Sequence, residues 1–323
     1  MDNVIRFVCP ECEMPVDQRK EELVKSISTW INSEALYKMV SAFGETIPNG
    51  SLRFKIDWLN EFANVWDYRK KHAQESERWC IEEDPALSSK EGVILDCVKQ
   101  LGLANIEKPL QVPDFILPLG GARLSNFARP KKAKEVIDEL NLQNRNIVAL
   151  SGTRPINEVE RPFLMEYAPN AITEYDAICS GMEKAFSIRG DHYYEEKHSN
   201  SNINLCWAKR TYDDLYLNNI IISMAAPSSD PIRRANSRDT FVHFLDEFRI
   251  TQGARLLLVT SCIYVPFQLL RFMDLAIERG FYVDCVGMPN NDNAGVSFSQ
   301  ITNYCQETKA TINAIKSISD KWL

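Results

Sequence analysis

Long apolar runs, a surplus of positive charge and the best-known catalytic signatures are all missing from this sequence. No apolar run approaches the ~18–20 residues that a membrane-spanning helix requires. The net charge is −7 and the pI is about 5.3, whereas nucleic-acid binding normally needs a basic face. The amino terminus has an early acid and no long apolar core, so it does not resemble a secretory signal. We therefore expect a cytoplasmic protein whose partners include neither nucleic acid nor membrane.

Short motifs that would identify a chemistry are absent as well. The chain has no phosphate-binding G-x-x-x-x-G-K-S/T, no dinucleotide-binding G-x-G-x-x-G and no G-x-S-x-G nucleophile elbow. Its four histidines form neither H-x-x-x-H nor H-E-x-x-H. Two of them, His192 and His198, lie in a polar stretch where solvated loop residues are the expected explanation.

The nine cysteines, an odd number, lie mostly inside apolar segments. This is typical of buried, reduced thiols in a cytosolic protein and not of a disulfide framework. Cys9 and Cys12 have the spacing of half a zinc ribbon or of a dithiol redox motif. Because a second C-x-x-C is missing, we predict no metal site.

The order of apolar patterns predicts the fold class. Residues 16–105 carry apolar side chains at helical spacing, which indicates an amino-terminal helical subdomain. From Asp114 onward strands alternate with helices, as in parallel βαβ units. We therefore predict an α/β protein, a Rossmann-like three-layer sandwich with a mostly parallel sheet, with domains at 1–110 and 111–323.

Strands are expected near 114–119, 146–150, 204–208, 219–224, 255–260 and 281–286. Helices are expected near 129–141, 158–168, 173–187, 237–250, 265–279 and 297–318. The polar and aromatic stretch 190–202 is expected to be a mobile loop.

Three of the predicted strands, near 114–119, 146–150 and 255–260, end in small or hydroxylated residues. Arginines follow the first two of these strands, and further arginines follow the strand predicted near 219–224. The carboxyl ends of parallel strands lie along one sheet edge, where such folds bind ligands, so these segments predict one cleft. Arginines, hydroxyls and backbone N–H groups of tight turns, here those of Gly121 and Gly152, are typical of an anion site. Structural turns and surface arginines are the alternative explanation. The predicted anion-binding residues are Gly120, Gly121, Arg123, Ser151, Gly152, Arg154, Arg234, Asn236, Ser237, Arg238, Thr260, Ser261 and Arg271.

Two acids are candidates for catalysis. Glu158, just after the second strand end, is the first choice as an acid–base or metal-organising group, and Asp239 is the second. An acid in the first turn of a helix is also favoured by the helix dipole alone, which is the alternative for Glu158.

Four of these elements, in this order, resemble the YdcF/SanA/ElyC-like family over about residues 114–290. The matches are Gly120-Gly121, Ser151-Gly152 with Glu158 or Glu160, Asn236-Ser237-Arg238-Asp239, and Val259-Thr260-Ser261 with Arg271. The resemblance implies an α/β sandwich of largely undefined activity, and for one member it implies S-adenosylmethionine binding. The chain departs from the family at Ser237, where threonine is usual, in lacking a histidine after the fourth element, and in an insertion at about 175–218.

Three functions follow from these observations. The first is an enzyme, a hydrolase or group transferase, acting on a phosphorylated or nucleotide-like small molecule. The second is an S-adenosylmethionine-binding protein such as a methyltransferase. The third is a metabolite sensor without enzymatic activity, whose amino-terminal helices recruit a protein partner. The sequence leaves the cofactor open between S-adenosylmethionine, a divalent cation and none.

Overall fold

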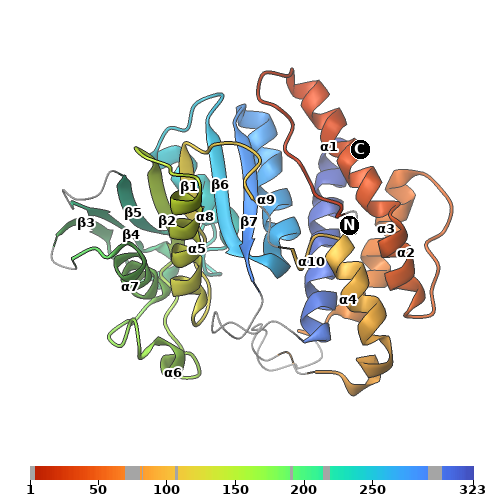
Figure 1. The fold of residues 1–323 in the computed structure, drawn as a ribbon, viewed down its shortest axis with the longest axis horizontal. Coiled ribbons are helices and arrows are strands. Elements are labelled where there is room, and N and C mark those ends of the chain that lie inside the picture. The colour runs from red at the N-terminus through yellow and green to blue at the C-terminus, as the bar shows by residue number, and fades with distance from the viewer. Residues whose placement is uncertain are drawn as a thin grey trace.

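The computed structural model describes residues 4–69, 81, 83–105, 108–189, 192–213, 219–289 and 300–323. Over these residues the chain is an α/β sandwich, with one mixed sheet and helices on both of its faces (Figure 1). No helix in this described part is long and apolar enough to cross a membrane.

The strands are β1 (Phe115–Pro118), β2 (Asn146–Gly152), β3 (Tyr193–His198), β4 (Trp207–Tyr212), β5 (Ile220–Ala226), β6 (Arg255–Ser261) and β7 (Tyr282–Met288). The α-helices are α1 (Val16–Ile31), α2 (Glu34–Ser41), α3 (Leu52–Phe62), α4 (Glu91–Gln100), α5 (Ser125–Glu139), α6 (Arg161–Leu164), α7 (Glu174–Phe186), α8 (Ser237–Glu247), α9 (Val265–Arg279) and α10 (Ile301–Trp322). Short 3-10 helices are η1 (Ala63–Trp66), η3 (Pro85–Lys90), η4 (Ile203–Leu205) and η5 (Cys262–Tyr264).

The sheet has seven strands in the order β3-β4-β5-β2-β1-β6-β7. The five strands from β5 to β7 in this order are parallel, while β3 and β4 add an antiparallel edge. This confirms the predicted α/β class with a mostly parallel sheet. Parallel strands are buried on both faces, which explains why the central strands are continuous apolar runs in the sequence.

Alternate residues of the central strands enter two different cores. Ile116 of β1 packs with α5 and α7 on one face, and its neighbour Leu117 belongs to the larger core on the other face. That larger core takes in α8 and α9 and continues without a break into α10 and the amino-terminal helices. Successive side chains of a strand point to opposite faces, so one short apolar run serves both layers.

The amino-terminal helices gather around the carboxyl-terminal helix (Figure 1). Helix α10 packs against α3, α4 and α9, and α1 packs against α3, α9 and α10. Buried Arg19 of α1 donates hydrogen bonds to the carbonyl oxygens of Ala276 and Ile277, at 3.1 Å each, and of Phe281 at 2.7 Å. These bonds attach α1 to the end of α9 and to the turn that follows it. The division into domains near residue 110 stays a prediction.

The antiparallel edge was wrongly expected to be mainly loop. Residues 193–198 form β3 where a mobile loop was predicted, and β4 begins at Trp207, three residues after the start of the strand predicted at 204–208. Both faces of β3 are partly or fully exposed, so the sequence shows no apolar alternation there. Polar, charged edge strands are common because they discourage pairing with other chains.

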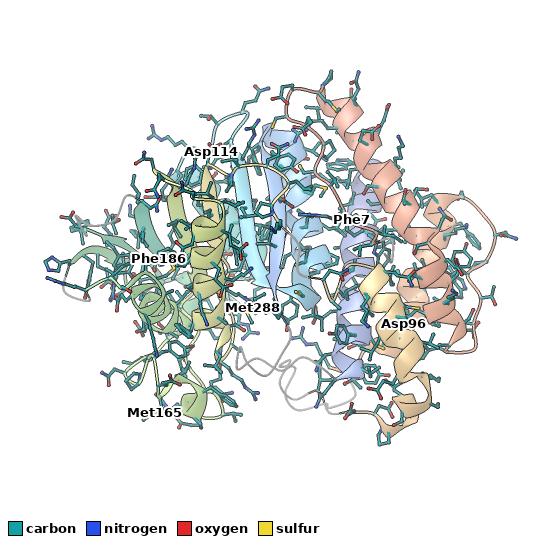
Figure 2. The ribbon with its side chains drawn as sticks, viewed as in Figure 1. Phe7, Asp96, Asp114, Met165, Phe186 and Met288 are labelled. Atoms are coloured by element: carbon teal, nitrogen blue, oxygen red, sulfur yellow. The ribbon has the colours of Figure 1, made fainter. Side chains whose placement is uncertain are left out.

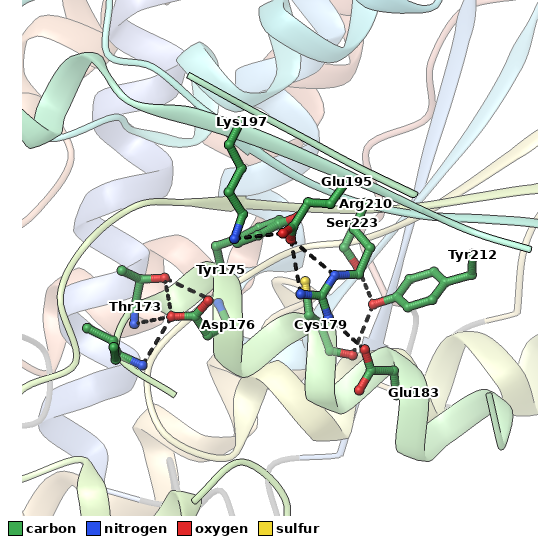
Figure 3. A network of polar contacts seen from close by, with 11 residues as sticks. Thr173, Tyr175, Asp176, Cys179, Glu183, Glu195, Lys197, Arg210, Tyr212 and Ser223 are labelled. Carbon is green, nitrogen blue, oxygen red and sulfur yellow. Dashed lines mark hydrogen bonds and ion pairs between the residues drawn. The ribbon is translucent and has the colours of Figure 1, made fainter. Parts of the chain in front are cut away.

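A charged network fastens this edge to helix α7, as Figure 3 shows. Arg210 of β4 donates to Glu183 of α7 at 2.8 Å and to Glu195 of β3 at 3.0 Å. Tyr175 of α7 donates to the same Glu195 oxygen at 3.0 Å. These contacts replace the apolar pattern that would normally anchor an edge strand.

Helices α5 and α7 approach each other at a position that only glycine fits. Pro130 within α5 has no N–H, so the carbonyl of Asn126 lacks the usual donor four residues on. That carbonyl oxygen faces Gly181 of α7, where a Cβ atom would lie 1.9 Å from it. The two helices therefore pack backbone to backbone.

Replacing Gly181 with alanine should destabilise the protein by about 3 kcal/mol or more, because neither backbone can move aside. Gly92 of α4 is the matched control, since nothing lies within 4 Å of a Cβ there. Gly92→Ala should be neutral or stabilise by up to about 1 kcal/mol. Urea unfolding of both variants checks this, and equal stabilities for the two would refute the proposed packing.

Candidate functional site

A cavity of about 860 Å³ opens at the carboxyl edge of the parallel strands. In Figure 2, Asp114 marks the amino end of β1 and Met288 the carboxyl end of β7, so the carboxyl edge is the lower one. The cavity volume lies within the range of small-molecule sites, roughly 300–1,000 Å³. The structure brings the following predicted residues into its lining: Gly120, Gly121, Arg123, Ser151, Gly152, Arg154, Arg234, Asn236 and Ser237.

Both predicted catalytic acids lie outside this lining. The side chain of Glu158 is 86% exposed and pairs with Arg161 at 3.0 Å. Asp239 pairs with Arg233 and closes a capping box with Asn236 at the start of α8. Partial burial alone would raise the pKa of Asp239, but hydrogen bonds from Arg233 and the Asn236 backbone lower it to about 2. A carboxylate that is held by these hydrogen bonds and has a lowered pKa is poorly suited to proton transfer.

Four predicted anion-binding residues are also absent from the lining. Arg238 pairs with Asp274 at 3.0 Å, on the surface of α8 and α9. Thr260 and Ser261 are fully buried at the end of β6, and Arg271 follows two turns into α9. Thr260 and Ser261 still belong to β6 and Arg238 belongs to α8, so none of the three lies in a turn that faces the cavity.

The paired glycines after β1 are held by the protein itself. The N–H of Gly120 donates to the Leu150 carbonyl at 2.6 Å, and that of Gly121 donates to the Asn126 side chain at 2.9 Å. Arg129 donates to the carbonyl oxygens of Leu119 and Gly120 and to the Ser261 hydroxyl. The expected role of the Gly121 N–H as an anion donor is therefore not available in this structure.

Arg154 binds two carboxylates of the protein. Its guanidinium holds Glu160 in a two-pronged contact at 2.6 and 2.9 Å, and its Nε donates to Glu174 at 3.1 Å. Glu160 is completely buried, which alone would raise its pKa, but Arg154 and the backbone of Asn157 and Arg123 lower it. Arg154 thus positions other residues, whereas the sequence predicted that it binds the ligand.

Glu174 is the residue that sequence reasoning missed, and it is the one acid among the described residues that line the cavity. A Cβ atom on Gly120 would lie 2.6 Å from its Oε1, so the glycine makes room for this carboxyl group. Burial raises the pKa of Glu174 despite the opposing charges of Arg154 and Arg234. Its sequence signal was hidden because an acid directly after the helix cap Thr173 is explained by the helix dipole.

Arg123 is held in an unusual backbone conformation at the cavity wall. Its φ of +54° lies in the left-handed region, which non-glycine residues adopt rarely and at a cost. The Tyr167 hydroxyl donates to its carbonyl at 2.7 Å, and its N–H donates to Glu160 at 3.3 Å. The guanidinium lies 4.6 Å from the ring centre of Phe163. Such strain clusters at ligand sites, where neighbouring contacts enforce it.

The cysteine and histidine candidates show no metal chemistry over the described residues. Cys9 and Cys12 are both buried, and burial raises the pKa of Cys9 to about 11. No group of three or more histidine, cysteine, aspartate or glutamate side chains in the part of the chain described here could hold a metal ion. His198 ends β3 and stacks on Trp207. Cys80 and His72 lie outside the described residues.

Comparison with models of known protein families finds a match to the Rv3785 N-terminal domain over residues 14–102. No curated protein and no solved structure matches the chain. The matched segment begins just before α1 and ends just after α4, so it coincides with the amino-terminal helices.

The expected membership of the YdcF/SanA/ElyC-like family is wrong. The family that matches is another one, and its match lies outside residues 114–290. Pairs such as Gly-Gly and Ser-Gly after strands recur wherever a parallel strand turns into a helix, which is why their order alone misled. The S-adenosylmethionine binding that the resemblance implied loses this support.

Replacing Glu160 with glutamine should destabilise the protein by about 3–5 kcal/mol at neutral pH, because it leaves the guanidinium of Arg154 buried without its main counter-charge. The folded pKa of Glu160 is lowered, so its stabilisation is present above the ordinary value of 4.5 and is lost as pH falls through the folded pKa. The difference between wild type and variant should therefore shrink in acid.

Urea unfolding at about pH 7 and about pH 3 measures this difference. Glu158→Gln, which changes an exposed acid two residues away, should leave stability nearly unchanged at both pH values. A gap between wild type and Glu160→Gln that stays constant with pH would show that the carboxylate charge is not the stabilising element.

Proposed function

We propose that this chain is an enzyme acting on a phosphorylated or nucleotide-like small molecule bound at the carboxyl ends of the parallel strands. The observation that carries the proposal is the charge of the cavity. In a chain with a net charge of −7, the described lining holds Glu174 as its acid against five arginines. These are Arg69, Arg123, Arg129, Arg154 and Arg234. A concave, cationic site in an acidic protein attracts anions selectively.

Arg123 and Arg234 are the arginines that we assign to the anion. The strained backbone of Arg123 fixes this residue at the cavity wall. Arg234 lies in the segment between β5 and α8, two residues before Asn236, the N-cap of α8. The positive end of the α8 dipole, at Asn236 and Ser237, adds to the attraction for a phosphate.

Glu174 is the acid–base group in this proposal, in place of Glu158 and Asp239. Its Oε2 is oriented by Arg154, and its Oε1 lies over Gly120 in the cavity. Burial raises the pKa of this carboxyl group above its ordinary value, as is common for groups that exchange protons in enzymes. Hydrolysis and group transfer to an acceptor both need such a group, and the proposal covers both.

The arrangement of the sheet supports a Rossmann-like classification. Counted along the chain, the parallel strands lie in the order third, second, first, fourth, fifth. The crossovers after β1 and β5 lie on opposite faces, so the strand order reverses between β1 and β6. Ligands of open α/β sheets bind at this reversal, which is where the cavity lies.

The arginines that line the cavity disfavour the binding of S-adenosylmethionine, because this molecule carries a sulfonium cation.

Replacing Arg234 with alanine should weaken the binding of a phosphorylated ligand by about 1.5–3 kcal/mol, roughly 10- to 150-fold in Kd, because a charge-assisted contact is lost. The measurement is a thermal-shift screen with inorganic phosphate, sugar phosphates and nucleotides, followed by calorimetry on the compounds that raise Tm. Arg255→Ala is the matched control, because this exposed arginine lies at the amino end of β6, on the opposite sheet edge. Equal affinity in the two variants would remove Arg234 from the site.

Replacing Glu174 with glutamine should separate binding from turnover. The amide keeps the shape and removes a negative charge from the cavity, so the affinity for an anion should stay the same or rise. Turnover of the same ligand should fall about 10²-fold or more, the contribution of a general acid–base group. Parallel calorimetry and turnover assays test this, and unchanged turnover would exclude Glu174 as the proton-transfer group.

A further inference from the structure

The cavity has two chemically different sides. β1 lies at the middle of the parallel strands, with β2 and β5 on one side and β6 and β7 on the other. The β2–β5 side, with the turn after β1, supplies Arg123, Arg154 and Arg234. The β6–β7 side supplies aromatic and amide side chains from the starts of α9 and α10: Tyr264, Phe267, Gln268, Gln300 and Asn303.

The α9–α10 side has little charge. The described charges there are those of Arg69, whose backbone N–H donates to Gln306 of α10 at 3.1 Å, and of Arg129, whose guanidinium lies 5.7 Å from the ring centre of Tyr264. Phe267 is partly buried and presents a ring at the cavity, next to amides that can both donate and accept hydrogen bonds. An aromatic face beside amide groups is how proteins hold a flat heterocyclic ring.

Gln268 gives the second, independent observation. Its side chain lines the cavity and is 6% exposed, and its Nε2 makes one long hydrogen bond to the Ser237 hydroxyl, at 3.4 Å. Its Oε1 has no hydrogen-bond partner. Buried side-chain amides in native proteins are nearly always satisfied, so this acceptor needs an explanation. The terminal torsion of glutamine is soft, so the amide group can turn without moving the rest of the side chain.

We propose that Phe267, Gln268 and Asn303 form a nucleobase subsite, so that the ligand of this cavity is a nucleotide and not a sugar phosphate. The base lies against Phe267, and a ring N–H or amino group donates to Gln268. The phosphate then lies on the side of Arg123 and Arg234. A volume of about 860 Å³ holds both parts. This inference rests on the proposed function, because the arginines must hold the phosphate.

The test compares the four ribonucleoside monophosphates with ribose 5-phosphate by calorimetry on the full chain. At least one nucleotide should bind roughly 5- to 150-fold more tightly than ribose 5-phosphate, the gain expected from stacking one base on an aromatic ring. Gln268→Leu should reduce the affinity for that nucleotide at least about fivefold and leave the affinity for ribose 5-phosphate unchanged. The unfolding midpoint of this variant should not fall, because an unsatisfied buried amide is replaced by an apolar group.

Gln143→Leu is the matched control, since this glutamine is exposed in the turn between α5 and β2. Asn303→Ala, at a partly exposed position of α10, repeats the test should Gln268→Leu fail to fold. Equal affinities for ribose 5-phosphate and all four nucleotides would overturn the base subsite and leave the anion site standing. Absence of binding by nucleotides, ribose 5-phosphate and inorganic phosphate alike would overturn the proposed function, and this inference with it.

Discussion

The buried contact of Arg154 with Glu160 is the constraint on which the rest of the site depends. Glu160 is fully buried and accepts from Arg154, and also from the backbone N–H groups of Asn157 and Arg123. One carboxylate thereby fixes the turn after β2 and the turn after β1. The Nε of the same guanidinium donates to Glu174 at the start of α7. A buried ion pair is costly to assemble, so its value here lies in fixing three segments in one arrangement.

That arrangement sets the positions of Glu174 and Arg123, the proposed acid–base group and one of the two arginines assigned to the anion. Glu174 reaches the cavity because Gly120 leaves room for its carboxyl group, and Arg154 prevents it from turning away. Arg123 reaches the cavity because Glu160 and Tyr167 hold its backbone in the left-handed region. The acid and the cation are therefore supported by the same buried carboxylate. Such support keeps a site in its productive geometry before the ligand arrives.

The sequence predicted the sheet well and the site only in part. Fully buried parallel strands are apolar runs, and α9 was placed correctly at Val265–Arg279 by its helical spacing. The edge strand β3 was not predicted because neither of its faces is buried, so its sequence shows no apolar alternation. Glu160 and Glu158 differ by two positions on an irregular turn, and no periodicity tells which one points inward. Glu174 was missed because an acid directly after the helix cap Thr173 is explained by the helix dipole alone.

The amino-terminal region contributes residues to the cavity as well as to the core. Residues 14–102 match the Rv3785 N-terminal domain, and within that segment Arg69 and Ile81 line the cavity. The backbone N–H of Arg69 donates to Gln306 of α10, the helix around which α3 and α4 pack and whose start carries Asn303. The position of α10, and with it the amide-rich wall, therefore depends on helices more than 200 residues earlier in the chain.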